Sequence, residues 1–178
     1  MKKGILVPIC TIVVAALFLC GISAVLRSTE EKNLQEKRLW LMQTILPESE
    51  VFTEEEYTGE DTNILAVYKA ENGYVVETSV YGYAGNITMF VGVSNEGTVT
   101  GMVVNDLSET YGLGANALTD HVFLAQFLNG EGDFTIGSDI DGITGATVTS
   151  KAVAKSMNSA VAFVTGADVE SGATSWGG

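Results

Sequence analysis

The chain has 178 residues, a formal net charge of −13 and only one histidine and two cysteines. This length suits one modest domain with an appendage and argues against a multidomain enzyme. The acidity argues against binding to nucleic acid, which requires a basic surface. So few histidines and cysteines also argue against a zinc or haem site formed by this chain alone.

Residues 4–26 form an apolar run of 23 positions without a charge. As a helix this run would cover roughly 34 Å, enough for a hydrocarbon core of about 30 Å. A cleaved signal peptide is one alternative, but the apolar region of a signal peptide is typically shorter. A lipoprotein anchored through Cys20 is another, but it would require small residues before the cysteine, where this chain has bulky ones. We therefore predict a cytoplasmic N-terminus over residues 1–3 and a retained transmembrane helix over 4–26.

The charges around this helix bear on its orientation. Four basic residues follow it. A literal count of positive charges would therefore place the side that follows the helix in the cytoplasm. That rule weakens for long translocated domains, and the chain beyond residue 38 holds 19 acidic residues against three lysines. We therefore predict a single-pass protein of the bacterial inner membrane, with its soluble body on the extracytoplasmic side.

Residues 27–63 are predicted to join the membrane helix to this body. Ser28 and Thr29 are candidate N-caps for an amphipathic helix that ends at Pro47. The acidic, turn-rich stretch 48–63 that follows is predicted to be a solvated linker.

From residue 64 onward the sequence pattern changes from a helical period to a period of two, which is typical of strands. Four runs rich in Val, Ile, Thr, Tyr and Phe are separated by "ENG", "YAG" and "NEG" and cover residues 64–70, 73–82, 86–94 and 98–106. Such short separators predict a meander of antiparallel strands.

Two helices are predicted after this sheet. The first places Phe123, Phe127 and Leu128 on one side, and the second covers residues 149–164 with an apolar stripe. The stripe consists of Val153, Met157, Ala160, Val161 and Val164. The fold class is therefore α+β, a small antiparallel sheet packed with two or three helices over residues 64–166, followed by a mobile tail over 167–178.

One short pattern occurs twice, as "DGITGAT" at residues 141–147 and "DVESGAT" at residues 168–174. In the first copy a glycine turn leads into a helix, whose first N–H groups favour an anion, and Thr147 places a hydroxyl there. Thr149, Ser150 and Lys151 add further donors and a cation. A plain helix cap is the alternative reading. Only "SWGG" follows Thr174, so we expect no helix after the second copy and interpret it as a chance match.

The segment "DGITGATVTSKAV" resembles the flavinylation motif of the FMN-binding domain family, Asp-x-x-Ser/Thr-Gly-Ala-Thr/Ser. The resemblance implies FMN bound covalently, as a phosphoester on Thr147. It also implies a cofactor site in the motif and in the Gly-rich loop 108–116, where Tyr111 replaces the usual proline. The motif residues of this site are Asp141, Thr144, Gly145, Ala146, Thr147, Val148, Thr149, Ser150 and Lys151, and the loop residues are Glu109, Thr110, Gly112, Leu113 and Gly114.

The chain as a whole resembles the G subunits of Rnf complexes, membrane ferredoxin:NAD+ oxidoreductases that couple electron flow to Na+ or H+ transport. The segments that carry this likeness are the N-terminal helix, "ILPESEVF", "GYAGNITMFVGV" and "ETYGLG". It implies an electron carrier without catalytic residues of its own. The implied partners are other membrane and iron–sulfur subunits and a flavin transferase that attaches FMN.

Three other readings remain open. The chain could be the C subunit of a Na+-translocating NADH:quinone reductase, or a stand-alone anchored extracytoplasmic flavoprotein. It could also be a structural subunit without a redox group, in which the motif serves only as a helix cap.

Overall fold

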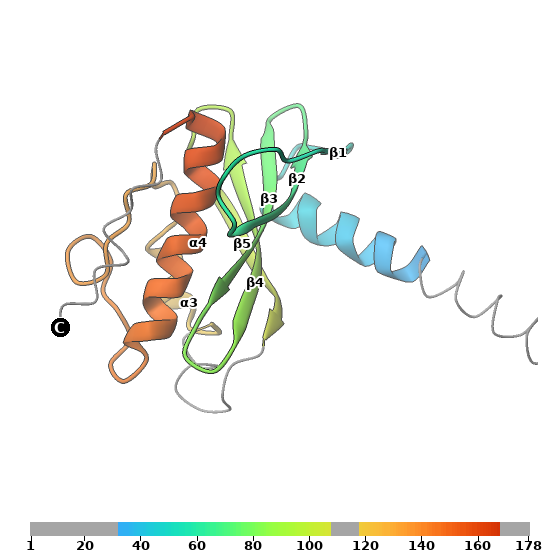
Figure 1. The fold of residues 1–178 in the computed structure, drawn as a ribbon. Coiled ribbons are helices and arrows are strands. Elements are labelled where there is room, and N and C mark those ends of the chain that lie inside the picture. Colours follow the sequence, from blue (N-terminus) through green and yellow to red (C-terminus); the bar gives the residue numbers. More distant parts are fainter. Residues whose placement is uncertain (1–31, 108–117, 168–178) are drawn as a thin grey trace, which may run out of the picture. The chain divides into compact units, whose positions relative to one another are not determined.

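The computed structural model describes residues 32–107 and 118–167 (Figure 1). The chain divides into two compact units between Trp40 and Leu41, within a helix that runs through residues 32–45. Among the residues described, no helix combines the length and apolarity needed to cross a membrane. The predicted span over 4–26 and the predicted tail from 168 onward lie outside these residues.

The unit that begins at Leu41, here called the body, contains a five-stranded antiparallel sheet. Its strands follow one another in chain order, so the sheet is a meander, which confirms the predicted antiparallel sheet. The four predicted runs match four of the strands to within one residue at either end. The strands are β1 Thr53–Glu55, β2 Ile64–Lys69, β3 Gly73–Tyr81, β4 Asn86–Ser94 and β5 Val99–Leu107.

Strand β1 lies in the acidic stretch that we interpreted as a linker. It is a short edge strand whose three residues are all exposed, and its Thr53 pairs with Lys69 of β2. Glu55 also lies 3.5 Å from the ammonium of Lys69, and this carboxylate, together with Tyr74, raises the pKa of Lys69 above its usual value. Adjacent glutamates have low strand propensity, so no local pattern marked this strand.

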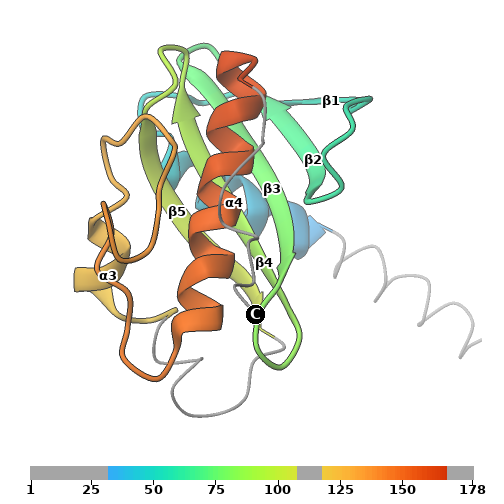
Figure 2. The same cartoon turned by 60° about the vertical axis from the view of Figure 1, so that its left-hand side comes forward.

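Helix α4, Thr147–Thr165, covers one face of the sheet (Figure 2). It starts two residues before the predicted 149 and ends at Gly166, whose φ of 69° is left-handed. Its predicted apolar stripe is confirmed, since Val153, Met157 and Val161 are buried with alternate residues of β3 and β4. Burial of such side chains is the main stabilising contribution to this layer.

The opposite face of the sheet contacts the end of the first helix. Met42, Ile45 and Leu46 form a second buried cluster with side chains of β2, β3 and β4. The helix end comes close because two glycines, Gly92 and Gly101, face each other across β4 and β5. A Cβ atom on Gly101 would lie only 2.8 Å from the Cα of Ile45.

Helix α3, His121–Ala125, begins at Asp120, whose carboxylate accepts bonds from the N–H groups of Val122 and Phe123 at 2.9 and 3.0 Å. Phe123 and Phe127 are buried as predicted, but Leu128 is 42% exposed. The prediction for Leu128 was wrong because α3 ends early. After Ala125 the chain winds through bonds between residues three apart, and this tighter winding turns Leu128 away from the helical face.

Candidate functional site

The first copy of the repeated motif forms the entry into α4. Gly145 has a φ of 82°, a left-handed conformation that glycine adopts without strain. The N–H of Ala146 donates to the carbonyl of Ile143 at 2.9 Å, and the N–H of Ser150 donates to the carbonyl of Ala146 at 2.9 Å, closing the first helical turn. No side chain caps this helix in the part of the chain that the structure describes. The described residues therefore leave the first N–H groups of α4 available to an anion.

The three hydroxyls at this terminus have different surroundings. Thr147 is exposed on the first helical residue. Ser150 is fully buried, and its hydroxyl donates to Ala146 at 3.0 Å and accepts from the N–H of Ile143 at 3.2 Å, so it fixes the turn. Thr149 is also fully buried, and within the described ranges its Oγ1 atom has no hydrogen-bond partner. Of the three, Thr147 is the hydroxyl that a reagent in solution can reach.

The other predicted site residues fall into two groups. In the motif, Ala146 is buried and Val148 is half-buried, whereas the other four residues are exposed. These exposed residues are Asp141, Thr144, Gly145 and Lys151. The loop residues Glu109, Thr110, Gly112, Leu113 and Gly114, like Thr174 of the second copy, lie outside the described residues.

The start of α4 lies at the same end of the body as the turn between β3 and β4 (Figures 1 and 2). Tyr81, in the predicted strand 73–82, and Tyr83, in the predicted separator "YAG", flank that turn and are 69% and 71% exposed. The opposite end of α4 contacts the turn between β4 and β5, where a Cβ atom on Gly97 would lie 2.5 Å from a methyl carbon of Thr165. The exposed motif thus shares its end of the sheet with two exposed aromatic rings.

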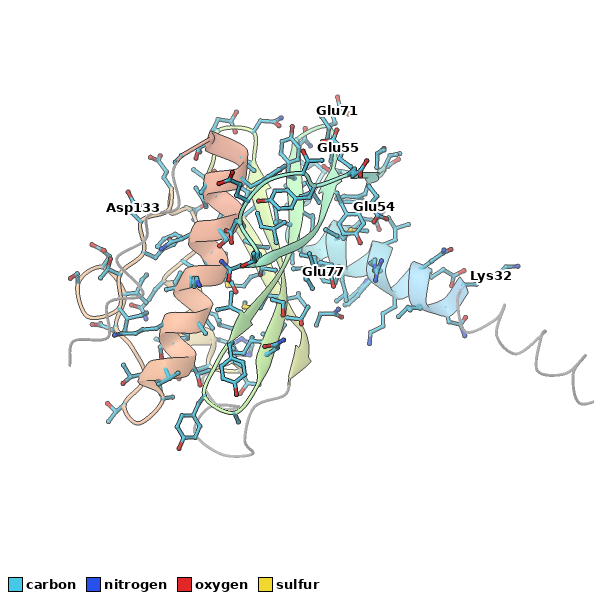
Figure 3. The ribbon with its side chains drawn as sticks, in the orientation of Figure 1. Lys32, Glu54, Glu55, Glu71, Glu77 and Asp133 are labelled. Atoms are coloured by element: carbon cyan, nitrogen blue, oxygen red, sulfur yellow. The ribbon has the colours of Figure 1, made fainter. Side chains whose placement is uncertain are left out.

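Carboxylates gather elsewhere on the body. Figure 3 shows Glu54, Glu55 and Glu71 near β1, toward the end of the sheet where α4 ends. A cavity of about 820 Å³ lies along the C-terminal half of α4 and is lined by residues 55–64 as well as by Phe163. Its four acidic side chains outnumber Lys155, the basic side chain in its lining, and would on balance repel a phosphate. The start of α4 is therefore the better seat for a phosphate group.

One residue at the site was not predicted from the sequence. The side-chain amide of Gln126 accepts a bond from the N–H of Asp141 at 2.8 Å and donates to the carbonyl of Asp141 at 3.2 Å. The two residues are fifteen positions apart and belong to no common periodic pattern. Within residues 32–107 and 118–167, no three His, Cys, Asp or Glu side chains come together in a way that would suit a metal ion.

Residues 82–162 match the model of the FMN-binding domain family. A curated relative from Methanosarcina acetivorans, named as the G subunit of an ion-translocating oxidoreductase complex, is 32% identical over 92% of this chain and 96% of its own length. Two further relatives come from Clostridium ljungdahlii and Acetobacterium woodii and are 40% and 36% identical over 110 and 98 residues. These two matches cover 55% and 50% of this chain, and 59% and 47% of the relatives' own lengths.

The matched family segment includes both the β3–β4 turn and the entry into α4. The likeness to the Methanosarcina relative extends over nearly the whole of both chains. The chain therefore belongs to the family of G subunits of Rnf-type, ion-translocating oxidoreductase complexes.

Proposed function

We propose that this chain is the electron-carrying flavin subunit of a membrane ferredoxin:NAD+ oxidoreductase, with FMN bound as a phosphoester on Thr147. The observation that carries this proposal is the exposed hydroxyl of Thr147 on the first residue of a helix that no described side chain caps. The Clostridium relative is named as part of a proton-translocating and the Acetobacterium relative as part of a Na+-translocating ferredoxin:NAD+ oxidoreductase complex. The names support coupling to Na+ or H+ transport and leave the ion open.

The residues at the start of α4 fit a phosphate group. The unpaired N–H groups of the first turn and the positive end of the helix dipole both favour a negative charge. The left-handed Gly145 lets the chain turn sharply before Thr147, and Lys151 adds an exposed cation one turn later. Thr149 Oγ1, buried in the same turn, has no hydrogen-bond partner within the described ranges, so the structure assigns this polar atom no other role.

Attachment requires a separate flavin transferase that uses FAD. The Thr147 oxygen attacks the phosphorus on the flavin side of the FAD pyrophosphate. A Thr147–phosphate bond forms, the bond between the two phosphates breaks, AMP leaves, and the hydroxyl proton is released to solvent. The reaction changes no oxidation state, so the phosphoester is a tether rather than a redox group.

When bound, FMN supplies a ring that accepts and releases electrons. The chain's own residues hold its phosphate and keep the ring at a high local concentration, independent of free FMN. The chain is thus a non-autonomous part of an oxidoreductase, and other membrane and iron–sulfur subunits supply the sites for ferredoxin and NAD+. Residues 4–26 anchor it in the membrane as a single-pass protein with the body on the extracytoplasmic side.

Mass spectrometry of peptides from the protein, produced together with an active flavin transferase, tests the proposal. We expect a peptide that contains Thr147 to be heavier by FMN less one water. Thr147→Ser keeps a hydroxyl at the same position and should keep the adduct, whereas Thr147→Val keeps the shape of the side chain and should lose it.

Two outcomes would count against this assignment. An adduct on Thr174 in the unaltered protein, with Thr147 unmodified, would move the flavin to the second copy of the motif. A protein without adduct on either threonine, made with a transferase that modifies another substrate in the same cells, would favour a structural subunit without a redox group.

A further inference from the structure

Gln126 holds the main chain of Asp141 from both sides. Its amide accepts from the N–H and donates to the carbonyl of this one residue, at 2.8 and 3.2 Å. Both polar groups of the Asp141 main chain are thereby occupied, and its side chain is exposed. A residue held at N–H and C=O has little backbone freedom, so the direction in which its side chain leaves the main chain is restricted.

The two bonds from Gln126 to Asp141, here called the clamp, are among several side-chain bonds that anchor one irregular segment. Residues 128–146 contain neither helix nor strand, apart from an isolated bridge between Ile136 and Ile140. Asn158 binds the N–H and carbonyl of Phe134 at 2.9 and 3.1 Å, and Ser150 binds Ile143 and Ala146. Asn158 and Ser150 are buried on α4, whereas the bonds from Gln126 are exposed to solvent.

The bonds of Asn158 and Ser150 therefore differ in their effect from those of Gln126. The bonds of Asn158 and Ser150 lie within the packed layer and stabilise the body as a whole. The bonds of Gln126 end on the first residue of the motif, at the surface that a modifying enzyme must contact. Loss of this clamp would free the Asp141 end of the segment while Ser150 still closes the turn at Ala146.

We propose that Gln126 is a positioning residue for attachment of FMN, which presents Asp141 and the turn before Thr147 to the flavin transferase in one conformation. This inference rests on the proposed function. Without the clamp the transferase would have to order the segment as it binds, and such ordering weakens binding. Loss of the two bonds should therefore raise KM more than it lowers kcat, with a decrease of about tenfold in kcat/KM.

The test uses the full-length protein, FAD and the transferase, with initial rates of FMN incorporation measured at several protein concentrations. Gln126→Leu keeps a side chain of similar size and removes both bonds. We expect about a tenfold decrease in kcat/KM, carried mainly by KM. Gln126→Glu keeps an acceptor for the N–H of Asp141 and should recover part of the loss.

Thr100→Val is the control for a general loss of stability. It removes the bond of 2.6 Å from the Thr100 hydroxyl to the carbonyl of Ile45, on the sheet face opposite α4, and should leave the rate of incorporation unchanged. An unchanged rate for Gln126→Leu would overturn the inference, as would an equal decrease for Thr100→Val. An unaltered protein that takes up no FMN on Thr147 would instead overturn the proposed function.

Discussion

At the scale of single residues, two buried serines of α4 make opposite contributions to stability. Ser150 and Ser156 are both fully buried, but only the hydroxyl of Ser156 lacks a partner within the described ranges. A buried hydroxyl without a partner costs about 1–3 kcal/mol, whereas one that is bonded stabilises by about 1 kcal/mol. We expect Ser156→Ala to raise the free energy of unfolding by about 1 kcal/mol and Ser150→Ala to lower it by about as much.

Urea unfolding followed by circular dichroism checks this pair. The two substitutions remove the same atom from the same helix, so each is the control for the other. A decrease in stability for Ser156→Ala would show that its hydroxyl is bonded in solution. An unchanged stability for Ser150→Ala would show that its bonds to Ile143 and Ala146 do not hold the turn before Thr147.

At the scale of elements, the two facing glycines of β4 and β5 set how closely the end of the first helix approaches the sheet. A Cβ atom on Gly101 would lie 2.8 Å from both the Cα and the carbonyl oxygen of Ile45, which are backbone atoms and cannot move aside alone. We expect Gly101→Ala to lower the free energy of unfolding by about 1–3 kcal/mol, as overpacking does. Asn105→Ala, an exposed change in the same strand, should stay within about 0.5 kcal/mol of the parent.

Thermal or urea unfolding of both variants measures the difference. If Gly101→Ala were as stable as Asn105→Ala, the helix end would not lie against these glycines in solution.

The elements also show how far the sequence alone could predict the structure. The four longer strands and α4 were predictable because burial on one face imposes a period of 2 or 3.6 over many residues. Strand β1 was missed because three exposed residues carry no such period. The motif before Thr147 was recognisable as a helix entry from its glycine and hydroxyls. The clamp by Gln126 was not, because a bond from a side chain to a distant main chain leaves no local signal.

At the scale of the whole molecule, the course of the meander decides which segments meet at the site. Strand β3 runs toward the end of the sheet where α4 begins, and β4 runs away from it, so the β3–β4 turn lies at that end (Figure 1). The FMN-binding domain match, residues 82–162, starts at this turn and leaves out the first helix. The family match therefore omits a helix whose end packs against the sheet, and the body's need for this helix end in folding can be tested.

The body should fold without residues 1–40 but not without residues 1–47. Met42, Ile45 and Leu46 are at most 5% exposed and form one buried cluster with Tyr68 and Phe90 of the sheet. Burial of three such side chains stabilises by roughly 5–9 kcal/mol, a large part of the roughly 5–15 kcal/mol typical of a domain. We expect a chain of residues 41–178 to unfold cooperatively in urea and one of residues 48–178 to lack a cooperative transition.

The triple substitution of Met42, Ile45 and Leu46 by serine in the 41–178 chain is the matched control, because it keeps the length and removes only the apolar side chains. It should behave like the shorter chain. Cooperative unfolding of the 48–178 chain at the urea concentration that unfolds 41–178 would mean that the second cluster contributes little. The sheet would then owe its stability to the layer formed with α4, and the helix end would be needed only to connect the body to residues 4–26.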